Sequence, residues 1–267
     1  MSRINACFAE LKRNQKKALI PYIVCGDPSL DVTVDLMHAL VEAGSDILEL
    51  GVPFSDPMAE GPTIQLAHER ALEHNTNLID IFNCVREFRK NDASTPIVLM
   101  GYANPIEKMG YDNFSDHASD AGVDGVLVVD LPYEEVGEFN QSLKRYELDN
   151  IFLLTPTTDN ERAQKTCAYA SGYLYYVSLK GVTGSSKLDV SSVQENYARI
   201  SAFTELPICV GFGISDAVSA RQVADIAEGV VIGSALINVM IDFQAKGSSF
   251  VDDTKQWMNN IRVAIDA

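Results

Sequence analysis

Long apolar runs are absent from this 267-residue chain, although 46% of its residues are hydrophobic. The longest runs, such as Val126–Val129, fall far short of the roughly 20 apolar residues that a membrane-spanning helix needs. The first residues, Met1–Asn5, also lack the order of charged and then apolar residues that a secretion signal has. We therefore expect a soluble, cytoplasmic protein with a core of substantial size.

Basic residues are few: 21 Lys and Arg stand against 37 Asp and Glu, which gives a net charge of −16. Binding to the phosphate backbone of DNA or RNA needs the opposite sign, so we expect no nucleic-acid partner. A small anionic substrate is compatible with this charge if backbone N–H groups hold it locally.

Patterns of paired metal ligands are also missing. The five cysteines are odd in number and none are paired at metal-ligand spacing, which predicts reduced thiols with a structural role and no metal. The four histidines fall in amphipathic, helix-like stretches without a His-x-x-x-His pattern. We therefore expect solvated helix positions for His38, His68, His74 and His117.

Eight short apolar runs rich in β-forming residues recur along the chain, and most show no alternation of polar and apolar residues. Such runs predict strands that are covered on both faces, as in a parallel sheet. The expected strands are 18–24, 46–50, 96–100, 124–129, 150–154, 173–178, 206–210 and 229–233.

Segments with helical periodicity lie between these runs, and additional helices are expected at residues 2–13 and 62–74. Eight strands that alternate with helices over about 250 residues predict an α/β fold, the (β/α)8 or TIM barrel. An open doubly wound sheet is the alternative, but no Gly-x-Gly-x-x-Gly follows the first strand. No low-complexity linker divides the chain, so we expect residues 1–267 to form one domain.

Two glutamates lie where catalytic groups of a barrel are found, near the C-terminal end of a strand. Glu49 falls in the apolar strand 46–50, and Glu60 follows eleven residues later in a loop rich in Pro and Gly. A buried carboxylate is costly unless it is used or paired, so the two are candidates for acid/base chemistry. Desolvation is expected to raise the pKa of Glu49 above that of Glu60, which lies on a more polar loop.

Each glutamate also has a structural interpretation. Glu49 could form an ion pair with an Arg or Lys across the barrel. Glu60 could stabilise the N-terminus of the helix that starts at Pro62, because acidic residues favour first turns.

Three glycine-rich turns follow the last three expected strands, at residues 181–184, 211–215 and 233–236. Glycine lets the backbone approach a ligand closely. A helix that begins after Gly233 and Ser234 would add the partial positive charge of its N-terminus. Since barrels often bind phosphate at the loops after their seventh and eighth strands, the three turns together predict a phosphate site.

Several segments resemble the hallmark segments of one family, the tryptophan synthase alpha subunits. They are Glu49–Pro57 (Glu-Leu-Gly-Val-Pro-Phe-Ser-Asp-Pro), Gly61–Gln65, Gly181–Gly184 and Gly211–Ile214, together with Pro21–Tyr22 and Gly26–Pro28. The resemblance covers nearly the whole chain in order, and the segment 49–65 is specific by itself.

The resemblance implies a lyase that cleaves indole-3-glycerol phosphate to indole and glyceraldehyde 3-phosphate by a retro-aldol step, without metal or cofactor. It implies that Glu49 is the general acid/base, that Glu60 is the second catalytic carboxylate and that Tyr175 lies near the first. The phosphate-binding residues that it implies are Thr183, on a lid loop, and Gly184, Gly213, Gly233 and Ser234. Glu60 departs from the family, in which this carboxylate is more often Asp.

The resemblance further implies a beta subunit that carries pyridoxal phosphate and receives the indole, in an alpha2beta2 heterotetramer. The loops 53–61 and 101–108 surround the same mouth and are its expected docking surface. Two other interpretations of the chain remain. Lys180 could act as a Schiff-base nucleophile, or the chain could be a non-catalytic phosphate sensor or partner-activating subunit, which the retained Glu49 disfavours.

Overall fold

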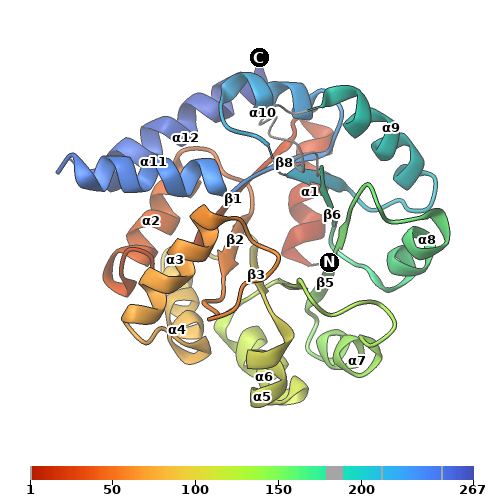
Figure 1. Ribbon diagram of the computed structural model, residues 1–267, viewed down its shortest axis with the longest axis horizontal. Coiled ribbons are helices and arrows are strands. Elements are labelled where there is room, and N and C mark those ends of the chain that lie inside the picture. The colour runs from red at the N-terminus through yellow and green to blue at the C-terminus, as the bar shows by residue number, and fades with distance from the viewer. Residues whose placement is uncertain (1, 179–188, 212, 248) are drawn as a thin grey trace.

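The strands of the chain close into a barrel. A computed structural model describes residues 2–178, 189–211, 213–247 and 249–267. Each strand runs parallel to the next in chain order, and β8 pairs with β1 (Figure 1). The predicted (β/α)8 barrel is thereby confirmed, and the open sheet is wrong. The strands are β1 (Ala18–Val24), β2 (Leu48–Gly51), β3 (Ile97–Gly101), β4 (Gly125–Val128), β5 (Asp149–Leu154), β6 (Leu174–Val177), β7 (Ile208–Gly211) and β8 (Gly229–Ile232).

Most helices form an outer ring around the strands, and the first of them lies inside this ring with its apolar face in the inner cluster (Figure 1). In the described ranges they are α1 (Arg3–Arg13), α2 (Leu30–Glu42), α3 (Pro62–Glu73), α4 (Leu78–Arg89), α5 (Ala103–Met109), α6 (Tyr111–Ala121), α7 (Gly137–Arg145), α8 (Asn160–Tyr169), α9 (Val190–Ser201), α10 (Ala217–Ala224), α11 (Ser234–Ala245) and α12 (Phe250–Asp266). The two additional helices expected from the sequence are α1 and α3. Among the helices of these ranges, none is long and apolar enough to cross a lipid bilayer.

Apolar side chains pack on both faces of the barrel wall. One cluster lies between the strands and the surrounding helices, and another fills the inside of the barrel. Along β1, Ile20 and Tyr22 belong to the inner cluster, whereas Leu19 and Ile23 belong to the outer one. All seven residues of this strand are buried. Burial on both faces explains why the strand sequences show no alternation of polar and apolar residues. Side chains that point inward line the barrel, and those near the C-terminal ends of the strands reach its mouth.

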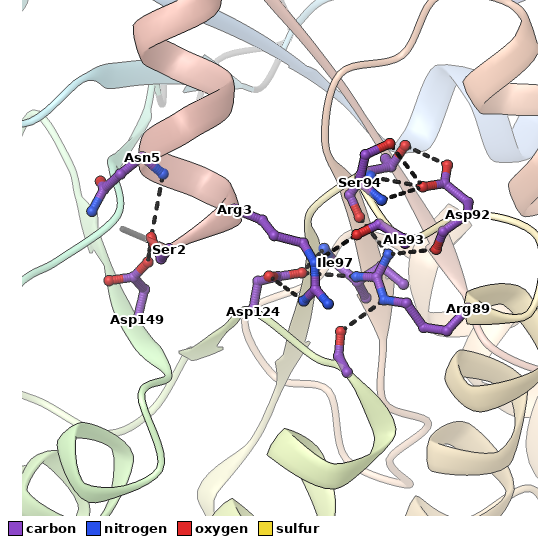
Figure 2. Close-up of polar contacts among 12 residues, drawn as sticks. Ser2, Arg3, Asn5, Arg89, Asp92, Ala93, Ser94, Ile97, Asp124 and Asp149 are labelled. Carbon is purple, nitrogen blue, oxygen red and sulfur yellow. Dashed lines mark hydrogen bonds and ion pairs between the residues drawn. The ribbon is translucent and has the colours of Figure 1, made fainter.

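Helix α1 covers the barrel at the N-terminal ends of the strands, inside the ring of helices (Figure 1), and Figure 2 shows its first residues beside Asp124 and Asp149. Its apolar face joins the inner cluster, and polar residues at its start fix its position. Ser2 Oγ donates to Asp149 Oδ2 at 2.8 Å, and Arg3 Nη1 lies 2.9 Å from Asp124 Oδ1. Arg89 holds the other oxygen of Asp124 at 2.8 Å. With this end closed, a ligand has access at the C-terminal ends of the strands, the usual place of the site in this fold.

Candidate active site

Glu49 lies inside the barrel on β2 and is fully buried. Tyr173 Oη donates to its Oε1 at 2.5 Å, whereas its Oε2 has no hydrogen-bond partner in the described part of the chain. Burial raises the pKa of Glu49 to about 7, the bond from Tyr173 lowers it, and the nearby charge of Glu60 raises it. No ion pair joins it to the Lys and Arg side chains of the described ranges, so the alternative of a cross-barrel salt bridge finds no support there.

Glu60 ends the loop that follows β2 and is half-buried. Both sides of its peptide are held: its N–H donates to the carbonyl oxygen of Pro57 at 3.0 Å, and its own carbonyl oxygen accepts from Gln65 Nε2 at 2.9 Å. Glu60 therefore contacts helix α3 through its backbone carbonyl and not through its carboxylate. The N-cap of α3 is Gly61. This arrangement leaves the carboxylate available for another role.

The expected difference in pKa between the two glutamates is wrong. Burial raises the pKa of Glu60 to about 7, the same value as for Glu49. The sequence of the loop is polar, but the fold of the loop at the barrel mouth shields this half-buried carboxyl from part of the surrounding water. Two neighbouring carboxyls with these pKa values can hold one proton between them near neutral pH, which suits an acid and a base acting together.

Aromatic and imidazole side chains anchor the loop that carries Glu60. The ring of Phe54 stacks on that of Tyr102, with centroids 5.1 Å apart, and the N–H of Ala59 donates to Tyr102 Oη at 3.2 Å. On the other side, the N–H of Phe54 donates to Nδ1 of His68, on α3, at 3.0 Å. The loop is thus held by Tyr102, the residue directly after β3, and by α3, and it brings Glu60 near enough to Glu49 to raise the pKa of Glu49.

Tyr175, predicted from the resemblance, lies on β6 and packs against the inner cluster. Burial raises its pKa well above the usual value, and Glu49 and Glu60 raise it further, so the phenol lies near both carboxylates. A Cβ on Gly211 of β7 would lie 2.2 Å from Tyr175 Oη. Glycine at position 211 therefore makes room for this hydroxyl.

Tyr173 is a site residue that sequence reasoning missed. It lies two residues before Tyr175, is fully buried, and belongs to the inner cluster with its hydroxyl bonded to Glu49. A signal was present, because alternate residues of a strand point to the same face. Once Tyr175 is placed toward the mouth, Tyr173 must point into the barrel below it.

The expectation that His68 is solvated is also wrong. The sequence predicted a solvated helix position, but His68 is 1% exposed and lies on the buried face of α3 with Ala67 and Ala71. Its Nε2 is 3.3 Å from Tyr22 Oη. Burial lowers its pKa to about 4, so the imidazole is neutral near neutral pH.

The expected phosphate-binding turns lie at the C-terminal ends of β7 and β8. Gly213 is exposed and has φ +76°, a conformation that favours glycine. Gly233 is the N-cap of the 12-residue helix α11 without a side-chain cap, and Ser234, the first helical residue, is exposed. These positions offer backbone N–H groups and a helix N-terminus to an anion. Thr183 and Gly184 lie outside the described residues, as does Lys180.

Metal ligands do not gather in the described ranges, which contain no cluster of three or more His, Cys, Asp or Glu side chains able to hold an ion. All five cysteines are free thiols, and four of them are buried. The chemistry that the described site can offer comes from its carboxyls, phenols and backbone amides.

Comparison with known proteins identifies the family. A family model described as tryptophan synthase alpha chain matches residues 8–265. The tryptophan synthase alpha chains of Cupriavidus metallidurans and Methylococcus capsulatus are 53% and 52% identical over 267 residues, covering all of both chains in each case. The crystal structure of tryptophan synthase subunit alpha from Legionella pneumophila superposes with a TM-score of 0.94 at 46% identity and covers 100% of this chain and 99% of that one. The chain therefore belongs to the tryptophan synthase alpha chain family, and it is a carbon–carbon lyase of tryptophan biosynthesis that cleaves indole-3-glycerol phosphate.

Proposed function

We propose that Glu49 and Glu60 are the acid/base pair that cleaves indole-3-glycerol phosphate in this chain. Breaking the bond between indole C3 and the glycerol side chain requires a proton on C3, which turns the ring into a leaving group. The ring nitrogen then carries developing positive charge. As the bond breaks, its electron pair returns to the ring and the neighbouring side-chain hydroxyl loses its proton to become an aldehyde.

Glu49 is assigned both proton transfers. It starts protonated and gives its proton to C3, and the carboxylate that results takes the proton of the side-chain hydroxyl. The carboxyl is thus restored at the end of the reaction. Two observations support this role: a pKa of about 7 allows both protonation states, and Tyr173 holds Oε1 while Oε2 has no partner in the described ranges.

Glu60 is assigned the stabilisation of the cation. Its ionised carboxylate would accept a hydrogen bond from the ring N–H, and this bond strengthens as positive charge develops. Tyr175 lies near both carboxylates and is assigned the orientation of the substrate between them. The indole ring would lie against the half-buried apolar residues Ile64, Val129 and Leu153, which pack on the inner cluster.

The phosphate of the substrate is assigned to Gly213, Gly233 and Ser234. Exposed backbone at two strand ends and the N-terminus of α11 support this assignment despite the negative charge of the chain. Thr183 and Gly184 complete the proposed phosphate site on the strength of the family resemblance.

A beta subunit is the proposed partner, in an alpha2beta2 heterotetramer in the cytoplasm. The loop 53–61 carries Met58, which is 78% exposed, and such an apolar side chain beside the mouth suits a docking surface. Pyridoxal phosphate would belong to the partner, and this chain would work as one barrel domain, residues 1–267, without a cofactor of its own.

Indole release from indole-3-glycerol phosphate tests these roles. Glu49→Gln keeps the size of the side chain but removes proton transfer, so kcat should fall by about 10²–10⁴-fold while substrate still binds. Glu10→Gln is a matched control, because Glu10 is an exposed residue of α1 at the closed end of the barrel. Wild-type turnover in Glu49→Gln would refute the assignment.

A further inference from the structure

Helix α3 contacts both ends of the loop segment that carries Glu60. Gln65 Nε2 donates to the carbonyl oxygen of Glu60 at 2.9 Å, and Nδ1 of His68 accepts the N–H of Phe54 at 3.0 Å. Gln65 and His68 both belong to α3 at a spacing of i and i+3, so their side chains are neighbours on one side of the helix. The helix thus holds the segment 54–60 at its first and at its last residue.

Phe54 is the residue at which contacts to the loop converge. Its ring stacks on that of Tyr102, and its N–H donates to His68. Backbone donors are scarce in this part of the loop, because Pro53 and Pro57 have no N–H. The bond from Phe54 to His68 is therefore a main attachment of the loop to the rest of the fold.

The direction of the bonds fixes the state of the His68 imidazole. Because the N–H of Phe54 donates to Nδ1, this nitrogen is an acceptor and carries no proton. A neutral imidazole then bears its proton on Nε2, which lies 3.3 Å from Tyr22 Oη and donates to it. Burial lowers the pKa of His68 to about 4, so the neutral form persists throughout the neutral pH range. Both nitrogens of this buried ring are thereby hydrogen-bonded.

Tyr22 gives the imidazole a fixed support on the barrel wall. It lies on β1 and belongs to the inner cluster. A Cβ on Gly51 of β2 would lie 2.4 Å from its hydroxyl oxygen, and a Cβ on Gly233, directly after β8, would lie 3.4 Å from its Cδ1. The ring is thus packed between the ends of the two strands that flank β1. The hydroxyl that accepts the Nε2 proton is held by the strands and not by the loop.

We propose that His68 is a positioning residue for the reaction, which fixes the loop that carries Glu60 to the barrel wall by accepting the N–H of Phe54 and donating to Tyr22. This inference rests on the proposed role of Glu60. Histidine suits the position because one ring nitrogen bonds the loop and the other bonds the wall. A catalytic group must be held to within a fraction of an ångström, so release of the loop at Phe54 should misplace the Glu60 carboxylate.

Amide variants of His68 separate its two bonds. The side-chain oxygen of Asn occupies the place of Nδ1, so His68→Asn still accepts the N–H of Phe54 but no longer reaches Tyr22. The longer Gln places its amide near Nε2, so His68→Gln reaches Tyr22 but leaves the N–H of Phe54 without its acceptor. His68→Leu removes both bonds.

The rate of indole release at neutral pH should follow the bond to the loop. We expect kcat to fall by about three- to tenfold in His68→Gln and His68→Leu, as for the loss of about one hydrogen bond, and by less than about twofold in His68→Asn. KM should change less than kcat, because the assigned role of Glu60 is to stabilise charge that develops in the transition state.

The carboxyl 13C titration of Glu60, measured without substrate, tests the same point independently of turnover. Burial raises the pKa of Glu60 to about 7. A released and more hydrated loop should therefore lower this pKa in His68→Gln and His68→Leu, whereas His68→Asn should titrate like the wild type. The acid limb of kcat, which reports the ionisation of Glu60, should move to lower pH with it. The titratable groups near Glu60 that these variants leave unchanged include Glu49, Tyr22, Tyr102 and Tyr175.

His74→Leu is the matched control. His74 lies at the C-terminal end of the same helix, and its Nε2 is 3.1 Å from the carbonyl oxygen of Pro28. The control therefore also removes a bond between a histidine of α3 and the backbone of a loop. It should leave both kcat and the titration of Glu60 in place.

The comparison of the two amide variants decides the proposal, even if His68→Leu does not fold. A lower kcat and a lower pKa of Glu60 in His68→Gln, with His68→Asn near the wild type, support it. Losses in His68→Asn that equal or exceed those in His68→Gln overturn it, and so does an unchanged titration of Glu60 in His68→Gln. If the wild type released no indole, the proposed function would fail while the titration still decided the role of His68.

Discussion

The hydroxyl of Tyr173 makes a bond whose removal should have a calculable effect on the pKa of Glu49. It donates to Glu49 Oε1 at 2.5 Å inside the barrel, and it lowers a pKa that burial raises to about 7. A hydrogen bond to a charged group contributes about 1.5–3 kcal/mol, and one pKa unit corresponds to about 1.36 kcal/mol. Tyr173→Phe should therefore raise the pKa of Glu49 by about one to two pH units.

The direction of the effect on activity follows from the role of Glu49. Because Glu49 gives the first proton, the reaction needs its protonated form, and activity falls as pH rises through its pKa. A higher pKa keeps the carboxyl protonated to higher pH, so the alkaline limb of kcat should move up by about one to two pH units. The acid limb, which reports the ionisation of Glu60, should stay in place. Indole release measured from mildly acidic to mildly alkaline pH gives both limbs.

Tyr197→Phe is the matched control for this prediction. Tyr197 Oη donates to Glu228 Oε1 at 2.7 Å, so the control removes a similar bond between a tyrosine and a glutamate. Glu228 directly precedes β8, at the end of the barrel that is opposite the mouth. An alkaline limb that stays in place or moves down in Tyr173→Phe would refute the assigned role of Glu49.

Two other variants probe the support of the site and its phosphate end. Arg70→Met leaves Asp27, which Arg70 binds through two bonds of 2.7 and 2.8 Å, buried without its partner. It should lower the free energy of unfolding by about 3 kcal/mol in urea titrations, and an unchanged midpoint would contradict this. Ser234→Asp places a carboxylate where the phosphate is proposed to bind, so KM should rise at least about tenfold by charge repulsion. Stability should be equal or slightly higher, because acidic residues suit helix N-termini, and an unchanged KM would remove Ser234 from the phosphate site.

The fold could be predicted from the sequence because its signals are local. Each strand is a short apolar run, and burial on both faces of the barrel explains why runs such as Ala18–Val24 show no alternation. The positions of Gly211 and Gly233 could also be predicted, since the C-terminal ends of all strands of a barrel lie together at its mouth.

The electrostatics of the site could not be predicted in the same way. The pKa of Glu60 depends on how the loop folds over the mouth, and that depends on contacts with Tyr102 and His68 that are distant in sequence. The burial of His68 could have been predicted from the sequence, because Ile64, Ala67 and Ala71 share its face of the helix at helical spacing. The bond from the N–H of Phe54 to Nδ1 of His68, which determines the tautomer of the imidazole, corresponds to no pattern in the sequence.

The acid/base mechanism requires that Glu49 and Glu60 lie near each other, and the titration of Glu49 in the variant Glu60→Gln measures this proximity. The charge of Glu60 raises the pKa of Glu49, so the pKa of Glu49 measured by carboxyl 13C NMR should be lower in the variant than in the wild type. It should stay above the pKa of a solvated glutamate, because burial remains. An unchanged pKa of Glu49 would mean that the two carboxyls do not share one mouth, and the acid/base mechanism built on them would be wrong.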